Sequence, residues 1–228
     1  MIQVHPRVDR LSKDIIEAYK QLAPATLGHI IESAMESAIE PMFRPIKLVG
    51  PALTVQTYPQ ITSAVGEALK IARPGDVLVI ARGGEHRHAT TGEIGALGYI
   101  ELGIAGMVSD GPIADRAAIS RMQFPTFSRG SVAMTGKTGG WGIEWGGVNV
   151  PVTVGGITVN PGDMVFGDDD GVLIATPEEA AEHLAFVQEK EEWEAWVREK
   201  ISAGLTISQC RAERPDPMTK VTIGTIRR

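Results

Sequence analysis

The sequence predicts an α/β protein in which helices pack on a largely parallel sheet. Residues 47–57 are rich in strand-forming side chains around a Gly-Pro pair, and apolar residues at helical spacing follow over 61–72. The next segment, 77–80, is a continuous apolar run, which is typical of a strand buried on both faces. Strand, helix and strand in this order indicate layered α/β packing.

Helices are expected before this unit, and shorter elements after it. Apolar residues recur at helical spacing over 8–22 and again over 26–39, so the segment 8–40 is predicted to be mostly helical. Between residues 90 and 112 the expected order is turn, helix, strand and turn. A short helix is expected over 117–122.

From residue 148 onward the sequence is typical of β-structure. The expected strands are 148–154, 157–159, 164–167 and 171–175. Gly155 and Gly156 lie between the first two strands and predict a hairpin turn. Three consecutive aspartates lie between the last two, and their side chains cannot all face one ion from a strand or a tight turn. Asp168, Asp169 and Asp170 are therefore interpreted as a solvated turn.

A long charged helix is expected over 177–203. Thr176 can cap its first turn, Pro177 suits the first helical position, and two glutamates follow at the positive end of the helix dipole. Acidic and basic side chains then recur at spacings that allow pairing along the helix surface. The segment is therefore predicted to be one continuous, largely solvated helix.

The composition is that of an ordinary globular protein, with 228 residues of which 43% are hydrophobic and 22% charged. This size fits one domain, 1–228, with the helical segments 8–40 and 177–203 as extensions. No apolar run is long enough to span a membrane, no signal segment is recognised, and Cys210 is the single cysteine, so a cytoplasmic location is expected. A net charge of −6 with 5% aromatic residues argues against a nucleic-acid partner.

The stretch 91–116 contains the residues best suited to chemistry. Thr91 and Gly92 precede the expected helix, and amide N–H groups at a helix start favour a carboxylate or a phosphate. Asp110 and Asp115 follow the next expected strand and could hold a hard divalent cation. An anion-binding loop beside a metal carboxylate predicts a site that polarises a 2-oxo acid.

A second polar loop, 82–88, directly follows the apolar run at 77–80, at a strand end where ligands tend to bind in α/β sheets. His86 and His88 next to Glu85 could ligate a transition metal. The favoured alternative is a charged, solvated loop that reaches a substrate anion through Arg87 or His88.

Several motifs together resemble the RraA-like family. The two most specific are Gly92-Glu93-Ile94-Gly95 and Asp110-Gly111-Pro112-Ile113-Ala114-Asp115. The weaker ones are 48–55, 74–80, 148–152, 154–156, 161–163 and 168–172, and they occur in the family's order. That family includes the 4-hydroxy-4-methyl-2-oxoglutarate and 4-carboxy-4-hydroxy-2-oxoadipate aldolases and the regulator of ribonuclease E activity A. The resemblance implies a three-layer β/β/α fold of the swivelling-domain type and a trimer or a dimer of trimers.

The resemblance also implies the layout of a site that binds Mg²⁺ or Mn²⁺. Asp115 is expected to ligate the metal directly, and Glu93 is expected to contact a metal-bound water. Glu194, on the C-terminal helix of a neighbouring subunit, is expected to reach the metal waters as well, with Glu192 as the second choice. Pyruvate is expected to bind the backbone amides of Gly92, Glu93, Ile94 and Gly95.

Two positions depart from the family pattern. Ala114 stands where the family has an arginine that grips the pyruvate oxygens, and an alanine supplies neither charge nor hydrogen bonds. Arg116 or Arg87 is the candidate replacement. His29 stands where relatives are expected to have an aspartate.

The resemblance implies a metal-dependent lyase acting on a 2-oxo acid, either by retro-aldol cleavage that releases pyruvate or by decarboxylation of oxaloacetate. The expected catalytic residues are Glu93, Asp115 and Arg116. Two alternatives stay open: a non-catalytic regulator that binds a ribonuclease, and an enzyme whose substrate differs because of Ala114.

Overall fold

The structure, a computed structural model, describes residues 1–8, 11–58, 60–136 and 145–221. Its main sheet has the strand order β1-β7-β3-β4-β5-β6-β2. Strands β3 to β6 run parallel to one another, whereas β7 and β2 are antiparallel to their neighbours β3 and β6. The bounds are β1 Ile2–Val4, β2 Glu40–Pro41, β3 Lys47–Thr57, β4 Val77–Ala81, β5 Gly106–Ser109, β6 Thr126–Ser128 and β7 Gly146–Val148.

Strand β3 joins the main sheet to a second β layer. Its first half, from Lys47 to Pro51, pairs antiparallel with β10 (Met164–Asp168), and its second half pairs with β4 and β7. Gly50 lies at the changeover, where a Cβ would collide with the carbonyl oxygen of Gly75. The Gly-Pro pair seen in the sequence therefore allows one long strand to belong to both layers.

The buried strands alternate between two cores, as the period of a strand requires. Leu78 and Ile80 of β4 face a core covered by α3 (Ser63–Leu69), α4 (Glu93–Glu101) and α5 (Arg116–Met122). Val77 and Val79 face the opposite core, which is covered by two hairpins. The hairpin strands are β8 Val152–Val154, β9 Ile157–Val159, β10 Met164–Asp168 and β11 Gly171–Ala175.

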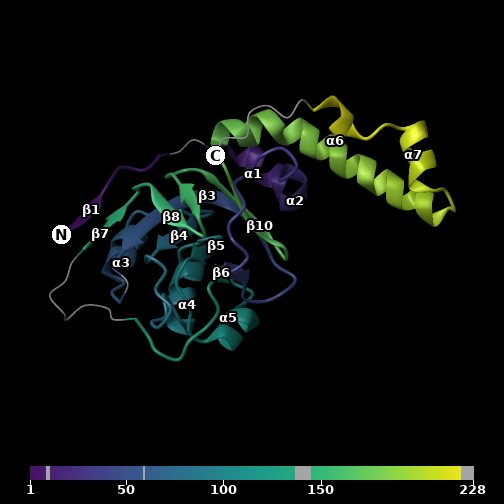
Figure 1. Ribbon diagram of the computed structural model, residues 1–228. Coiled ribbons are helices and arrows are strands. Elements are labelled where there is room, and N and C mark those ends of the chain that lie inside the picture. The colour runs from purple at the N-terminus through teal and green to yellow at the C-terminus, as the bar shows by residue number, and fades with distance from the viewer. Residues whose placement is uncertain (9–10, 59, 137–144, 222–228) are drawn as a thin grey trace.

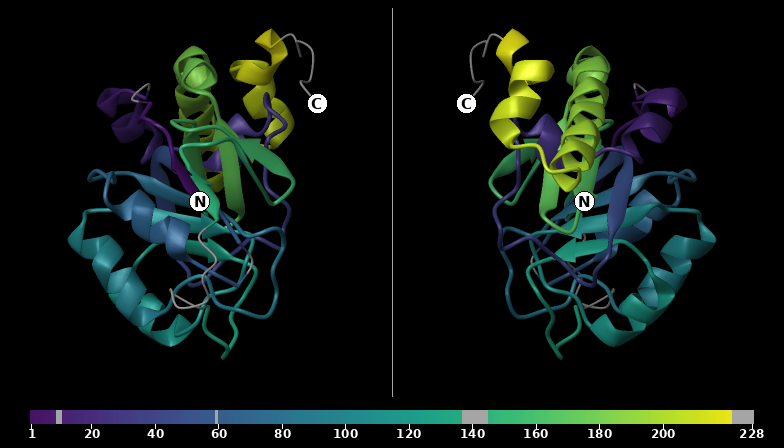
Figure 2. Two further views of the ribbon diagram at one scale, coloured as in Figure 1. Left: turned by 90° about the vertical axis from the view of Figure 1, so that its left-hand side faces the viewer. Right: turned by 90° about the vertical axis from the view of Figure 1, so that its right-hand side faces the viewer.

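A third core lies on the outer side of the β10–β11 hairpin. It is covered by α1 (Lys13–Tyr19), α2 (Pro24–Leu27) and α6 (Pro177–Ser202), and the Tyr19 hydroxyl donates to the Ala180 carbonyl oxygen across this layer. Figure 2 shows α6 and α7 at the opposite end of the molecule from α4 and α5. The predicted β/β/α layering with N-terminal helices and a long C-terminal helix is therefore confirmed.

The helix predicted over 26–39 is wrong for most of its length, because α2 ends at Leu27. The following segment pairs instead with the edge of β11: Met35 N donates to Val172 O at 2.8 Å, and Ile174 N donates to Ser33 O at 3.1 Å. Met35 and Ile39 are still buried, so the apolar pattern correctly predicted which residues face the core, although not that they lie in a helix. The backbone N–H and C=O groups of this segment form hydrogen bonds with the edge of β11, so the segment does not become the helix that its apolar spacing predicts.

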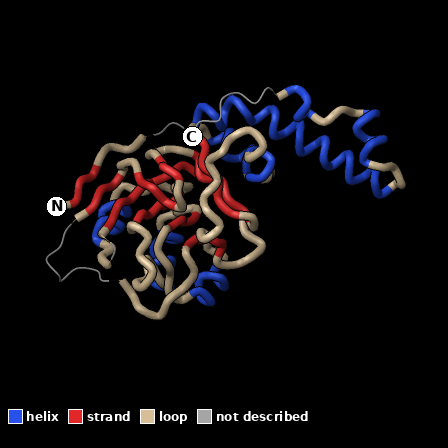
Figure 3. The backbone as a smooth tube through the Cα atoms, viewed as in Figure 1, coloured by secondary structure: helices blue, strands red, loops and turns tan. Residues whose placement is uncertain are grey.

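The C-terminal region forms an arm that points away from the main body (Figure 1). The predicted long helix is α6, whose first turn is closed by a capping box between Thr176 and Glu179. Two further elements pack against α6 and were not predicted from the sequence: α7 (Ile207–Glu213) and the 3₁₀-helix η1 (Pro217–Lys220). Figure 3 shows the arm as almost wholly helical. In the described parts of the chain, no helix is long and apolar enough to cross a membrane.

Candidate functional site

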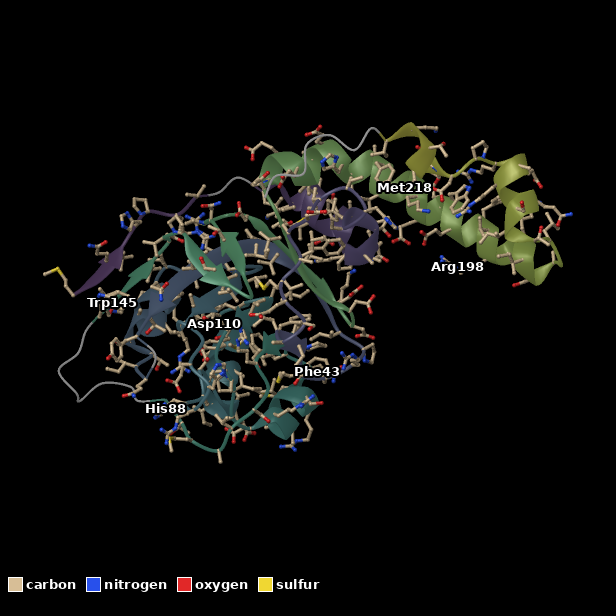
Figure 4. All side chains as sticks on the ribbon, in the orientation of Figure 1. Phe43, His88, Asp110, Trp145, Arg198 and Met218 are labelled. Atoms are coloured by element: carbon tan, nitrogen blue, oxygen red, sulfur yellow. The ribbon has the colours of Figure 1, made fainter. Side chains whose placement is uncertain are left out.

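The candidate site lies where the parallel strands β4 and β5 end. The loop 82–92 follows β4, and the loop 110–115 follows β5, so the two loops meet at the carboxyl edge of the sheet. Figure 4 labels His88 of the first loop and Asp110 of the second, both in the main body and away from the arm. This edge is where open α/β sheets bind their ligands.

The carboxylate of Asp115 lies against the start of α4. Its Oδ2 atom accepts a hydrogen bond from the backbone N–H of Glu93 at 2.9 Å. A Cβ at position 92 would lie 2.5 Å from the same oxygen, so glycine is required there for this close approach. Asp115 itself is exposed and adopts a left-handed backbone conformation (φ 55°, ψ 37°) at the N-cap of α5, a region that aspartate tolerates better than most residues.

Helix α4 presents its first turn beside this carboxylate. Gly92 is its N-cap, with Glu93 and Ile94 exposed to solvent. Gly95 packs so closely on the Thr91 hydroxyl that a side chain would collide with it, and burial raises the pKa of Tyr99, which hydrogen-bonds to Thr91. Residues 92–95 and Asp115 therefore lie together, as the sequence analysis expected.

Asp110 has a structural task, which corrects the expectation that both aspartates could hold one cation. Its two carboxylate oxygens accept hydrogen bonds from Arg82 N at 2.6 Å and Gly84 N at 2.8 Å, and the residue is only 5% exposed. Asp110 thus joins the end of β5 to the start of the loop after β4.

Glu85 organises the tip of the same loop. One carboxylate oxygen accepts hydrogen bonds from Arg87 N at 2.6 Å and His88 N at 3.1 Å, and it lies 3.1 Å from His88 Nδ1. Burial alone would raise the pKa of Glu85, but these contacts together hold it below its ordinary value. Within the described ranges no group of three His, Cys, Asp or Glu side chains could hold a metal, so the less favoured possibility of a metal site at His86 and His88 finds no support.

Residues 13–174 match the family model described as Aldolase/RraA. The chain belongs to the RraA-like family. It is 37% identical over 165 residues to a protein of Halalkalibacterium halodurans that carries the provisional name 4-hydroxy-4-methyl-2-oxoglutarate aldolase, a match covering 71% of this chain and 76% of that one.

Two solved structures are also similar over most of the chain. An uncharacterized protein from Pseudomonas syringae pv. tomato has a TM-score of 0.77 and 26% identity, with 90% of this chain and all of that one covered. Streptomyces coelicolor RraAS2, described as an unusual member of the RNase ES inhibitor RraA family, has a TM-score of 0.74 and 27% identity, with 84% of this chain and all of that one covered.

Ala114, which stands where the resemblance implies an arginine, is buried, and its backbone N–H donates to Thr91 O at 2.8 Å. Arg116, one candidate replacement, points its Nε at the carbonyl oxygen of Met42, 2.9 Å away. Arg87, the other candidate, has an exposed side chain on the loop after β4. Arg116 is therefore held by a backbone carbonyl, whereas Arg87 is exposed on the neighbouring loop.

Glu194 lies on α6 in the arm, far from the candidate site of the same chain. Glu194 pairs with Lys190 at 3.3 Å and with Arg198 at 3.8 Å on α6. Figure 4 labels Arg198 far out on the arm, well separated from His88 and Asp110. His29, the other departure from the RraA-like pattern, is exposed after α2.

The donor set of this site fits a hydrated divalent cation. Asp115 is an exposed carboxylate with one oxygen anchored by an amide, and Glu93 is exposed beside it. Mg²⁺ usually keeps several waters and binds through one or two carboxylates. A single direct ligand with an acidic neighbour is therefore sufficient for such an ion.

The sequence analysis missed Arg82, Thr90 and Ser109, which lie beneath the two loops. Thr90 Oγ1 lies 3.1 Å from both Arg82 Nη1 and Ser109 Oγ. All three are buried, and Arg82 is completely so. An arginine that directly follows an apolar strand resembles a solvated loop residue in sequence, so only the fold reveals its position.

Proposed function

We propose that this protein is a divalent-metal-dependent lyase that cleaves a carbon–carbon bond in a 2-oxo acid, either by retro-aldol cleavage or by decarboxylation of oxaloacetate. The observation that carries the proposal is the carboxylate of Asp115 beside the first amides of α4, with the Cβ-free position of Gly92 between them. The aldolase name of the Halalkalibacterium halodurans relative supports the same reaction class.

In this proposal each residue of the site has a separate task. Asp115 would hold Mg²⁺ or Mn²⁺, and the bound ion would act as a Lewis acid toward the 2-keto oxygen of the substrate. The amides of residues 92–95 would bind the substrate carboxylate, since N–H groups at a helix start favour anions. Glu93 would orient a water molecule, and Arg116 or Arg87 would add positive charge at the substrate.

The proposal also requires a homo-oligomer, a trimer or a dimer of trimers. Glu194 would come from the arm of a neighbouring copy and reach the metal waters, because its own arm points away from its own site. The solvent-facing side of α4 carries large apolar residues at Ile94, Leu97 and Ile100, which are 80%, 46% and 42% exposed. A contiguous apolar surface of this kind is common at protein–protein contacts.

The same surface supports a second candidate function, a regulator that binds a ribonuclease. The RraAS2 relative is described as belonging to an RNase inhibitor family, and Ala114 stands where the resemblance implies an arginine that would contact the substrate. The retained carboxylate and anion-binding loop favour the lyase, because a protein-binding surface needs neither.

Turnover of oxaloacetate and of 4-hydroxy-2-oxo acids with Mg²⁺ or Mn²⁺, with and without chelator, tests the proposal. Asp115→Ala is expected to lower kcat/KM by about 100-fold or more, since an electrostatic group at the reacting oxygen contributes several kcal/mol. Asp170→Ala, at an exposed aspartate in the β10–β11 turn, is the matched control and should retain activity. Activity that survives both chelation and Asp115→Ala would exclude the metal mechanism, and equal ribonuclease inhibition by wild type and Asp115→Ala would favour the regulator.

A further inference from the structure

Arg82 is the first residue after β4 and one of the largest fully buried side chains, with 0% of its surface exposed. Removing a guanidinium from water is costly unless its donors find acceptors. Burial lowers the pKa of Arg82 from its ordinary value, and the nearby carboxylates of Glu85 and Asp110 oppose that shift. A buried cation in this place therefore needs a dense set of polar neighbours.

Those neighbours belong to two loops of the chain. Arg82 Nη1 donates to the carbonyl oxygen of His88 at 2.6 Å and to the hydroxyl of Thr90 at 3.1 Å, both on the loop after β4. The backbone N–H of Arg82 donates to Asp110, on the loop after β5. At Gly111 a Cβ would lie 3.0 Å from Arg82 Cδ, so the second loop packs closely on the arginine stem.

From Thr90 the contacts continue to the candidate site. Its hydroxyl lies 3.1 Å from Ser109 Oγ, and its backbone N–H donates to Pro112 O at 2.7 Å. One residue later, Thr91 O accepts from Ala114 N at 2.8 Å. The loops thus run side by side, joined by hydrogen bonds, from Arg82 to the position where Asp115 meets the start of α4.

We propose that Arg82 is a positioning residue that sets the spacing between the two loops and thereby places the Asp115 carboxylate against the amides of residues 92–95. The functional part of this inference rests on the proposed function, whereas the coupling of the loops does not. Arg82 acts from beneath the site, because its guanidinium donates to His88 and Thr90 and its stem packs on Gly111 of the second loop. Its bond to Asp110 comes from the backbone N–H and is kept when the side chain is changed. Its planar fork suits several acceptors at once, which the single ammonium of lysine reproduces poorly.

The decisive variants are Arg82→Lys, which keeps the charge, and Thr90→Val, which keeps the shape but removes the hydroxyl. Thr54→Val is the matched control. Thr54 is also a fully buried threonine, in β3, and its hydroxyl has no hydrogen-bond partner among the described residues. Both variants remove a buried threonine hydroxyl from the full chain, but only the hydroxyl of Thr90 contacts Arg82 and Ser109.

Two measurements are made on each variant: amide hydrogen exchange of peptides covering 83–93 and 109–116, and the affinity for Mn²⁺ followed by electron paramagnetic resonance. Arg82→Lys is expected to speed exchange at least tenfold in both peptides and to weaken Mn²⁺ binding about tenfold. Thr90→Val should give the same pattern with effects of about threefold. Thr54→Val should leave both quantities at the wild-type value.

Faster exchange confined to 83–93, with 109–116 unchanged, would overturn the inference, as would unchanged exchange in Arg82→Lys. Should Arg82→Lys fail to fold, Thr90→Val decides by the same criterion. Wild-type protein that binds no Mn²⁺ would count against the proposed function alone, because the exchange measurement still reports whether Arg82 couples the loops.

Discussion

The two ends of β4 each carry a buried aspartate and a largely buried arginine, but the groups are connected differently. At the amino end, Asp76 forms a two-point ion pair with Arg7, with one bond of 2.7 Å between Arg7 Nη2 and Asp76 Oδ1, and accepts the Arg73 N–H at 2.7 Å. At the carboxyl end, Asp110 accepts backbone N–H groups, while Arg82 Nη1 donates to a carbonyl and a hydroxyl.

This difference indicates that the amino end of β4 stabilises the fold, whereas the carboxyl end positions the groups of the candidate site. The pair at the amino end closes the turn before β4 and fastens the N-terminal segment, beside an open groove of about 480 Å³ lined by Val4, His5, Pro6, Arg7, Ile71 and Arg73. The contacts at the carboxyl end tie two loops to each other and hold the candidate ligand-binding groups at a fixed distance. Changes at the amino end should therefore alter the free energy of unfolding, and changes at the carboxyl end should alter binding.

Asp76→Ala is expected to have the largest effect on stability. Asp76 is 2% exposed and the Arg7 side chain 14%, so the variant leaves a cation largely buried without its carboxylate. Loss of one partner from such a pair costs roughly 3 kcal/mol of unfolding free energy. Urea denaturation measures the loss, and the Mn²⁺ affinity of the folded fraction should stay within about twofold of wild type. A strong loss of Mn²⁺ affinity would show that the two ends of β4 are not independent.

A pair of glycines sharpens the comparison with smaller changes. Gly92→Ala, at the carboxyl end, would place a Cβ 2.5 Å from Asp115 Oδ2 and push the carboxylate away. Misplacement of a binding group by about 1 Å can cost on the order of 100-fold, so Mn²⁺ and oxalate affinity should fall by about tenfold or more. The free energy of unfolding should change by less than about 1 kcal/mol, because Gly92 is the half-buried N-cap of α4 and its extended backbone suits alanine.

Gly103→Ala is the counterpart at the amino end. Gly103 has φ +73°, its Cβ position lies 3.0 Å from Pro74, and its carbonyl oxygen accepts from Gly75 N in the turn before β4. An alanine in this conformation should cost about 1 kcal/mol of unfolding free energy or slightly more. Calorimetry should show that loss without a change in oxalate affinity. A loss of oxalate affinity in Gly103→Ala, or a large loss of unfolding free energy in Gly92→Ala, would contradict the different roles assigned to the two ends of β4.

The sequence predicts what local pattern and polarity determine. Strand β3 has its predicted bounds, 47–57, because branched apolar residues and the Gly-Pro pair specify a strand wherever it packs. The loop at 92–95 and Asp115 were predicted as neighbours because they follow adjacent strands. Each of these expectations depends on a short stretch of chain or on sheet order alone.

The rest depends on contacts between distant segments. The region after α2 has a helical period but pairs with the edge of β11, a partner more than 130 residues away. Asp110 and Asp115 are alike in sequence. Only the folded loops show that Asp110 is buried with both oxygens on backbone amides, whereas Asp115 is exposed with a single amide bond. The start of α7 did have a local signal, the Thr206–Gln209 capping box, that the weak apolar period obscured.

The smallest predicted effect is a pH dependence confined to the loop after β4. The pKa of Glu85 lies below its ordinary value because hydrogen bonds from the Arg87 and His88 segment outweigh burial, which acts in the opposite direction. A carboxyl group with a lowered pKa in the folded state contributes stability that is present above its unfolded pKa and is lost as the pH falls through the folded value. The protection of the amides at 85–89, corrected for the intrinsic pH dependence of hydrogen exchange, should therefore decrease in acid.

Glu85→Gln isolates this effect, because the amide keeps the shape and an acceptor oxygen but does not titrate in this range. The variant should show about threefold lower protection at 85–89 at neutral pH, and little further loss of this corrected protection in acid. Peptides that cover the Arg7–Asp76 turn should show no difference between the two proteins at neutral pH. An equal acceleration at both ends of β4 in Glu85→Gln would mean that Glu85 supports the whole domain and not one loop.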